Sequence, residues 1–171
     1  MTFNAEFLDR DFRVNRPQII GIPSTNDLTI NRHKYLLPAD VVKGKRILDI
    51  GGGPSSMLLK CIDLKSGLVV DPIPYPDWTI DRYAMKNIQV SVDVGENVNE
   101  TGWDEVWIYN CMQHAIDPSK IIQNALLGAK VLRIFEWIDV PAHDGHPHEL
   151  TEQNLNEWIG AKGHIIELAE S

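Results

Sequence analysis

From about Lys45 to the end of the chain, hydrophobic residues follow two patterns: short continuous runs and recurrence at helical spacing. Short aliphatic and β-branched runs, typical of buried strands, lie at residues 46–50, 67–71, 88–92, 105–110, 131–135 and 164–168. Apolar side chains recur at helical spacing at residues 55–64 and 117–127, and Thr151 is placed to cap a third helix. Strands that alternate with crossover helices favour a parallel sheet covered on both faces. We therefore expect an α/β three-layer sandwich with a mostly parallel sheet of six to seven strands.

The first 42 residues have a different character, because they are rich in Asn, Pro, Thr and Arg and show little periodicity before residues 32–37. This change divides the chain into an N-terminal segment, residues 1–42, and one α/β domain, residues 43–171. The N-terminal segment is either an arm with one short helix that packs on the sheet or a lid over a ligand site.

Charge and composition narrow the classes of function. The 171 residues include 24 acidic and 16 basic side chains, and no basic cluster is larger than Lys43, Lys45 and Arg46. Proteins that grip nucleic acid usually present a basic patch, so DNA and RNA are disfavoured as partners. No apolar run approaches the roughly 20 residues of a membrane span, and the chain starts without the features of a signal peptide. We expect a cytoplasmic protein that does not enter the membrane, and the oligomeric state stays open.

The stretch after the first predicted strand carries the most chemical information. Gly51, Gly52 and Gly53 lie at a strand-to-helix turn, where glycine lets the backbone approach a ligand closely. A dinucleotide site would require a third glycine at Ser56 to complete its G-x-G-x-x-G pattern. A carboxylate at Asp49 suits the cationic amino-acid end of a sulfonium cofactor better than a pyrophosphate.

This stretch resembles the first motif of the class I S-adenosylmethionine-dependent methyltransferases, an acidic residue followed by x-G-x-G. Asp49, Gly51 and Gly53 match that motif, and Ser55 stands at its third small position. The family places an acidic residue at the end of its second strand to hold both ribose hydroxyls, and Asp71 matches it. One carboxylate can accept two hydrogen bonds from a vicinal diol, which gives this implied role a physical basis.

The resemblance continues to about residue 168. The family has an aspartate near the adenine amino group after its third strand, and Asp93 matches it. Residues 103–114 resemble the family's fourth motif, with Gln113 where glutamate is common. The resemblance implies a Rossmann-like methyltransferase domain with S-adenosylmethionine as its cofactor. The cofactor-binding residues that it implies are Asp49, Gly51, Gly52, Gly53, Asp71, Pro72, Asp93, Val94 and Asn110.

The chain departs from the family at two places in its last third. Residues 127–130 replace the usual Pro-Gly-Gly before the fifth strand, although a turn can still form there. Only one strand is predicted after the last helix, where the family commonly has two in a closing hairpin. Either the sheet has six strands, or the edge of that hairpin comes from elsewhere in the chain.

Methyl transfer needs positioning and, for some acceptors, a general base. His114, after the fourth strand, is our first candidate for this base, and Glu136, in the fifth strand, is the second. The structural alternatives are a histidine that packs on the following helix and a paired carboxylate. Three further histidines, His143, His146 and His148, lie in the loop after the fifth strand. Their spacing fits no common metal site, so we expect no metal; the loop either borders an acceptor pocket or is a structural connector.

Three functions compete on this sequence. The first is an S-adenosylmethionine-dependent methyltransferase that acts on a small-molecule acceptor, which the sequence does not identify. The second is a non-catalytic module of the same fold that binds the cofactor or a partner. The third, an NAD-dependent oxidoreductase, is disfavoured by Asp49 and by the missing third glycine.

Overall fold

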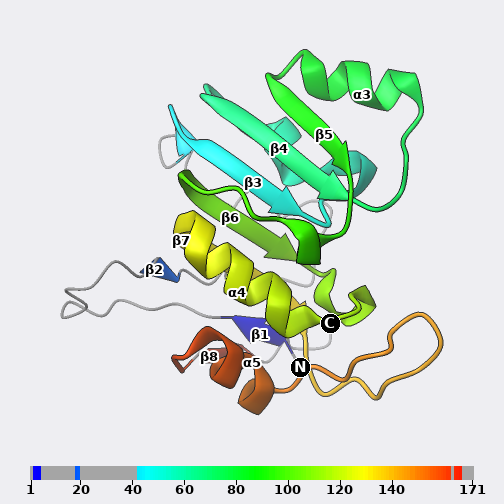
Figure 1. Cartoon of the computed structure of the whole chain (residues 1–171), viewed down its shortest axis with the longest axis vertical. Helices are drawn as coiled ribbons and strands as arrows, with labels where there is room; N and C mark the ends of the chain where they lie inside the picture. The colour runs from blue at the N-terminus through cyan, green and yellow to red at the C-terminus, as the bar shows by residue number, and fades with distance from the viewer. Residues whose placement is uncertain (1, 5–17, 20–41, 163, 167–171) are drawn as a thin grey trace.

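Five parallel strands form the centre of one twisted sheet in the computed structural model, which describes residues 2–4, 18–19, 42–162 and 164–166 (Figure 1). In spatial order β5-β4-β3-β6-β7, these strands are Ile88–Val92, Ser66–Asp71, Arg46–Ile50, Trp103–Tyr109 and Ala129–Trp137. The chain builds outward from β3 through β4 to β5, and then crosses back to form β6 and β7 on the other side of β3. The switch point, where parallel α/β sheets bind their ligands, therefore lies between the carboxyl ends of β3 and β6.

Three short strands extend the sheet beyond β7 to a total of eight. β1 (Thr2–Asn4) runs antiparallel between β7 and β8 (His164–Ile166), and β2 (Gln18–Ile19) pairs in parallel with β7. The second strand of the closing pair, which the sequence lacked after its last helix, is thus supplied by β1 from the start of the chain, and β8 lies at the edge of the sheet. The short helix and the lid, the two alternatives for the N-terminal segment, fall within residues 5–17 and 20–41, outside the described residues.

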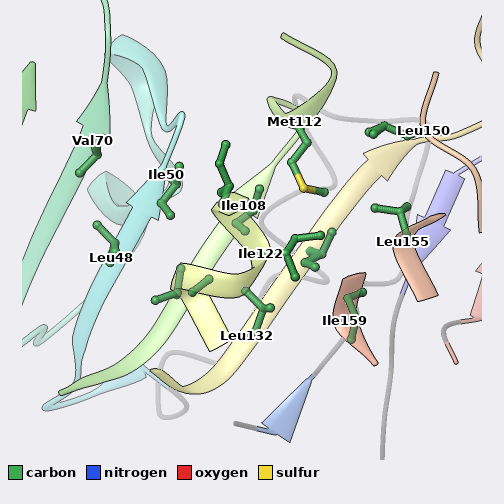
Figure 2. Packing of buried hydrophobic residues seen from close by; sticks show 14 of the residues in the cluster. Leu48, Ile50, Val70, Ile108, Met112, Ile122, Leu132, Leu150, Leu155 and Ile159 are labelled. Atoms are coloured by element: carbon green, nitrogen blue, oxygen red, sulfur yellow. The ribbon is translucent and has the colours of Figure 1, made fainter. Parts of the chain in front are cut away.

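Helices cover both faces of the sheet. α4 (Pro118–Gly128) and α5 (Glu152–Ile159) pack on one face, where their aliphatic side chains meet those of β3, β4, β6 and β7 (Figure 2). α3 (Asp77–Ala84) and the short 3-10 helix η2 (Met57–Lys60) supply Tyr83 and Leu58 to a second cluster on the opposite face. The predicted α/β sandwich with a mostly parallel sheet is confirmed, although its parallel centre of five strands is slightly smaller than the predicted sheet.

The helix predicted at residues 55–64 is wrong. That segment forms two 3-10 helices, η1 (Gly53–Ser55) and η2, separated by Ser56 in an extended conformation with ψ 146°. The Ser56 side chain accepts a hydrogen bond from the amide of Leu58, and this local bond competes with a continuous helix. Cys61 is extended again, so the segment ends after one turn.

The other helices show where the pattern was informative. α4 confirms the helix predicted at 117–127, and Thr151 caps α5 as predicted. The Thr151 hydroxyl accepts from the amide of Asn154, and the Asn154 side chain accepts from the amide of Thr151. α3 was not predicted, because only Thr79 and Tyr83 of its eight residues are buried and leave a weak apolar pattern.

None of the helices that the structure describes is both long and apolar enough for a membrane span.

Candidate functional site

The glycine turn after β3 is shaped by close packing as well as by backbone conformation. Gly51 has φ 71°, and a Cβ atom there would lie 2.4 Å from Cβ of Cys111 at the end of β6. A Cβ atom at Gly52 would lie 2.5 Å from Oδ2 of Asp49. Gly53 also has a positive φ, 66°, but nothing lies within 4 Å of the position that its Cβ would take. The turn is therefore tightly packed at its base and open at Gly53, where a ligand can approach the backbone.

Asp49 lies beneath this turn, with 2% of its surface exposed. Its Oδ2 accepts a hydrogen bond from the Ser56 hydroxyl. The Tyr83 hydroxyl accepts from the amide of Ser56 at 2.8 Å and donates to the carbonyl of Gly53 at 2.6 Å. These bonds hold the turn from below, and the Asp49 carboxyl group lies beneath the turn and not on its open side.

Asp71 ends β4 and is linked to the glycine turn. Its Oδ2 accepts from the amide of Gly53 at 3.2 Å, and its Oδ1 accepts from the amide of Ile73 at 2.9 Å. A carboxylate offers about four lone-pair positions, so both oxygens keep capacity for further donors such as a vicinal diol. Burial, and then the neighbouring Asp71 carboxylate, raise the pKa of the Tyr75 phenol, which keeps that hydroxyl protonated beside Asp71.

Asp93 follows β5, next to Asp71 along the same edge of the sheet. The amide of Asp93 donates to the carbonyl of Asp71 at 3.2 Å. The exposed Asp93 carboxylate accepts from the amide of Val94 and from the Asn97 side chain, each at 2.8 Å. Pro72 is exposed and Val94 is half-buried beside them. Two of the predicted cofactor-binding acids are thus brought together at this edge.

The turn after β6 brings Asn110 and His114 to the switch point. Asn110 has φ 56°, a left-handed conformation that asparagine tolerates, and its amide donates to the carbonyl of Phe135 at 2.7 Å. Oε1 of Glu136 accepts from the amides of Cys111 at 2.9 Å and Met112 at 3.0 Å. Among the described residues Glu136 Oε2 has no hydrogen-bond partner, and burial raises the pKa of this carboxyl to about 8. The structure thus places Glu136 beneath the turn.

A cavity of about 180 Å³ opens beyond β6 and β7. It is lined by His114, His146 and His148 with Asn110, Gln113 and Trp137, and by the apolar Val140 and Leu150. The loop that carries His146 and His148 is the long connection between β7 and α5, orange in Figure 1. Glu136, the second candidate base, does not line this cavity, whereas the first, His114, does.

Three imidazole rings lie in a row at this cavity. The ring centre of His146 lies 4.4 Å from that of His114 and 4.5 Å from that of His143. Nδ1 of His114 lies 2.6 Å from the carbonyl oxygen of Gly145, an acceptor only, so this nitrogen carries a proton. In the described part of the chain no group of three or more His, Cys, Asp or Glu side chains is arranged to hold a metal ion.

The sequence left the histidine loop either as a border of an acceptor pocket or as a structural connector, and did not distinguish His146 from His143 and His148. Trp137, Val140 and Leu150 were also missed, because the loop's course is fixed by long-range contacts. The only local signal was the density of histidines after the fifth strand.

The two cysteines are free thiols, and burial raises the pKa of Cys61 to about 12 and that of Cys111 well above its usual value.

Comparisons with known proteins identify the fold. No family model and no curated protein matches the sequence. Among solved structures, a SAM dependent methyltransferase from Aquifex aeolicus matches with TM-score 0.55 and 18% identity, over 77% of this chain and 81% of that one. The 1,6-didemethyltoxoflavin-N1-methyltransferase of Burkholderia thailandensis, solved with 1,6-didemethyltoxoflavin and S-adenosylhomocysteine, matches with TM-score 0.58 and 16% identity, over 79% and 67%.

A third neighbour is the [4+2]-cyclase SpnF, with TM-score 0.52 and 18% identity, over 71% of this chain and 54% of that one. The chain thus has the class I Rossmann-like methyltransferase fold, as the sequence resemblance implied. Because folds host several chemistries, the reaction has to be argued from the site itself.

Proposed function

We propose that this chain is an S-adenosylmethionine-dependent methyltransferase that acts on a small molecule. The observation that carries the proposal is the placement of two carboxylates around an open glycine turn at the switch point. Asp49 lies under Gly52, and Asp71 accepts from the amide of Gly53. This surrounding favours a ligand with a positive charge and a ribose over one with a pyrophosphate.

The structure of the turn argues against the dinucleotide alternative. A pyrophosphate is normally held by the amides and dipole at the start of a helix. Here the glycine turn is followed by two 3-10 helices of three and four residues, which present no such dipole.

Each group of the expected cofactor has a complementary residue. The backbone of Gly51–Gly53 would contact its amino-acid part, and Asp71 would accept from its ribose hydroxyls. Asp93 and Val94 would border its adenine, and Asn110 would lie near the sulfonium. The cofactor supplies an activated methyl group, so the protein's part is to align the acceptor and, where needed, remove its proton. His114 lines the cavity in which that acceptor would sit.

Two alternatives stay distinct from this proposal. A non-catalytic module would bind the cofactor without consuming it. The second alternative is an enzyme that catalyses a reaction without methyl transfer, since one structural neighbour is named a [4+2]-cyclase. Conversion of S-adenosylmethionine to S-adenosylhomocysteine in the presence of acceptors separates both from a methyltransferase.

Calorimetric titration with S-adenosylmethionine, S-adenosylhomocysteine and NAD tests the cofactor. We expect both sulfur ligands to bind and NAD not to bind. Asp71→Asn should weaken binding by about tenfold or more, because it removes a charged acceptor. Asp81→Asn, at an exposed position in the neighbouring helix α3, is the matched control and should bind like the wild type. Binding of NAD in place of the sulfur ligands would refute the proposal.

A further inference from the structure

We propose that the cavity beyond β6 and β7 binds a planar acceptor of one ring that carries a weakly acidic O–H or N–H group, and that His146 removes its proton. The inference rests on the proposed function, since the cavity holds an acceptor only if a methyl donor binds at the glycine turn. Four observations support it: the size of the cavity, its lack of charge, its position and the arrangement of its histidines.

The cavity has the size of one ring. Its volume of about 180 Å³ is below the roughly 300–1,000 Å³ of common ligand pockets. An engineered cavity of about 150 Å³ holds benzene, so this space suits a single substituted ring. The rings of Trp137 and the histidines provide flat surfaces, and Val140 and Leu150 provide apolar ones.

The lining selects against a charged amine. No Asp, Glu, Lys or Arg side chain is among the described residues that line the cavity. A cationic acceptor would therefore lose its water without gaining an ionic partner, which is costly. A neutral ring can instead exchange hydrogen bonds with the amides of Asn110 and Gln113 and with the histidine nitrogens.

The position of the cavity fits methyl transfer. Asn110 lines it and also directly follows β6, at the switch point beside the glycine turn. The next residue, Cys111, packs directly against Gly51. A ring in this cavity would therefore present its edge toward a ligand that lies over the glycine turn.

His146 is the best placed of the histidines to act as a base. It is half-buried and lines the cavity, whereas His114 and His143 on either side of it are exposed. His148 is half-buried and lines the cavity as well, but its Nε2 is already engaged by the carbonyl oxygen of Ile116 at 3.1 Å. The two backbone hydrogen bonds between His143 and His146, both 2.9 Å, and Gly145 with φ 90° fix the turn that carries it. Desolvation, then His114 and His143, lower the pKa of His146, which favours the neutral imidazole that can accept a proton.

The titratable groups around His146 come from two elements. His114 faces it from η4 (Met112–His114), and His143 faces it from its own turn, which also contains the exposed Asp144. His148 shares the cavity lining. After proton transfer, the exposed rings of His114 and His143 provide the route to solvent.

The step is balanced in atoms and charge. The acceptor proton moves to His146, which becomes an imidazolium, and the acceptor lone pair forms a bond to the methyl carbon. The carbon–sulfur bond breaks with its electrons on sulfur, so the cationic donor leaves as a neutral thioether. His146 then releases the proton to solvent.

The test uses 4-nitrophenol as a one-ring probe whose phenolate absorbs differently from the phenol. The protein is first saturated with S-adenosylhomocysteine and then titrated with the probe at several pH values. We expect saturable binding, with 4-nitro-1-naphthol, a two-ring analogue, at least about tenfold weaker. Val140→Trp, which fills the cavity from a partly exposed position, should remove binding, whereas Val92→Trp, at an exposed site on β5, should not.

The spectrum of the bound probe tests His146 itself. A nearby imidazolium favours the phenolate, so wild-type protein should ionise the bound probe at a pH about one unit or more below that for His146→Gln. Glu149→Gln, at an exposed position of the same loop, is the matched control; it should keep the phenolate signal, since Glu149 does not line the cavity. A purely structural role of His146 would leave the spectrum of bound probe unchanged.

The outcomes separate this inference from the proposed function. If S-adenosylhomocysteine binds but the probe does not, or if Val140→Trp leaves probe binding intact, the one-ring acceptor site is refuted and the proposed function stands. If His146→Gln keeps the phenolate signal, the role of His146 is refuted. If S-adenosylhomocysteine does not bind, the proposed function fails, and with it the acceptor role of the cavity.

Discussion

The backbone amide of Gly53 donates a hydrogen bond to Oδ2 of Asp71 across 3.2 Å, and so joins the turn after β3 to the end of β4. The other oxygen of Asp71 accepts from Ile73, so the carboxylate is fixed between two loops before any ligand binds. Fixing a recognition group in this way lowers the entropy lost on binding. The same bond places the open side of Gly53 next to the acid that we expect to recognise the ribose.

Gly51 and Gly53 give a matched pair of substitutions, because both have positive φ but only Gly51 is tightly packed. Gly51→Ala would bring its Cβ within 2.4 Å of Cβ of Cys111, whereas Gly53→Ala meets nothing within 4 Å. Gly53→Ala should cost about 1–2 kcal/mol for the left-handed backbone alone. Gly51→Ala should cost clearly more, because β3 and β6 must move apart. Urea unfolding of both variants measures this, and equal losses would contradict the packing argument.

The parts of the fold that the sequence predicted are those with a local cause. Runs of β-branched residues marked the five central strands, and Thr151 marked the start of α5. Because parallel strands end at the same edge, Asp71, Asp93 and Asn110 could be expected to gather there before the structure was known. The methyltransferase fold followed from the order of these motifs.

The parts that could not be predicted depend on contacts between distant segments. β1 has only three residues, and its place between β7 and β8 is set by strands more than 100 positions away. His114 meets His146 across 32 positions because Gly145 turns the loop back. Glu136 was a plausible base by position, but its binding to the amides of Cys111 and Met112 depends on the register of β6 and β7.

Glu136 should make stability depend on pH in an unusual direction. Burial raises its pKa in the folded protein to about 8 from an ordinary value of 4.5, so the fold favours the protonated form. Its contribution is therefore complete below about pH 4.5 and is lost as the pH rises through about 8. Glu136→Gln removes the ionisation. From pH 5 to pH 9 the free energy of unfolding of the variant should therefore rise relative to that of the wild type by several kcal/mol, at about 1.4 kcal/mol per pKa unit. Urea midpoints at both pH values test this.

The control for Glu136 is Glu149→Gln, at an exposed position in the loop before α5. Its difference from the wild type should stay constant over the same pH range. A Glu136→Gln variant whose stability relative to the wild type does not change with pH would show that this carboxyl is already ionised in the fold.

The buried Glu105, on β6, should contribute strongly to the free energy of unfolding. Its two oxygens accept from Lys45 at 2.6 Å, Arg133 at 2.7 Å and the Trp107 indole at 2.8 Å. Burial acts to raise its pKa, but Arg133, Lys45 and Trp107 outweigh it and hold the pKa below the ordinary value. Glu105→Gln leaves the buried Arg133 without its counter-charge and should cost about 3–5 kcal/mol.

Lys130→Ala is the matched control for this network. Lys130 pairs with Asp104 at 2.6 Å, but its side chain is 75% exposed. Solvent screening should limit its effect on unfolding to less than about 1 kcal/mol. Similar losses in the two variants would mean that burial does not strengthen the Glu105 pairs as argued.

β1 should control the order of the C-terminal edge of the sheet. Phe3 pairs with Glu136 of β7 on one side and with Ile165 of β8 on the other. Phe3→Pro removes the amide hydrogen that this strand donates, and proline is poorly tolerated inside a sheet. Hydrogen exchange should therefore accelerate by about tenfold or more at residues 164–166, while amides of β3 and β4 keep their protection. Unchanged exchange at 164–166 would show that β8 is held without β1.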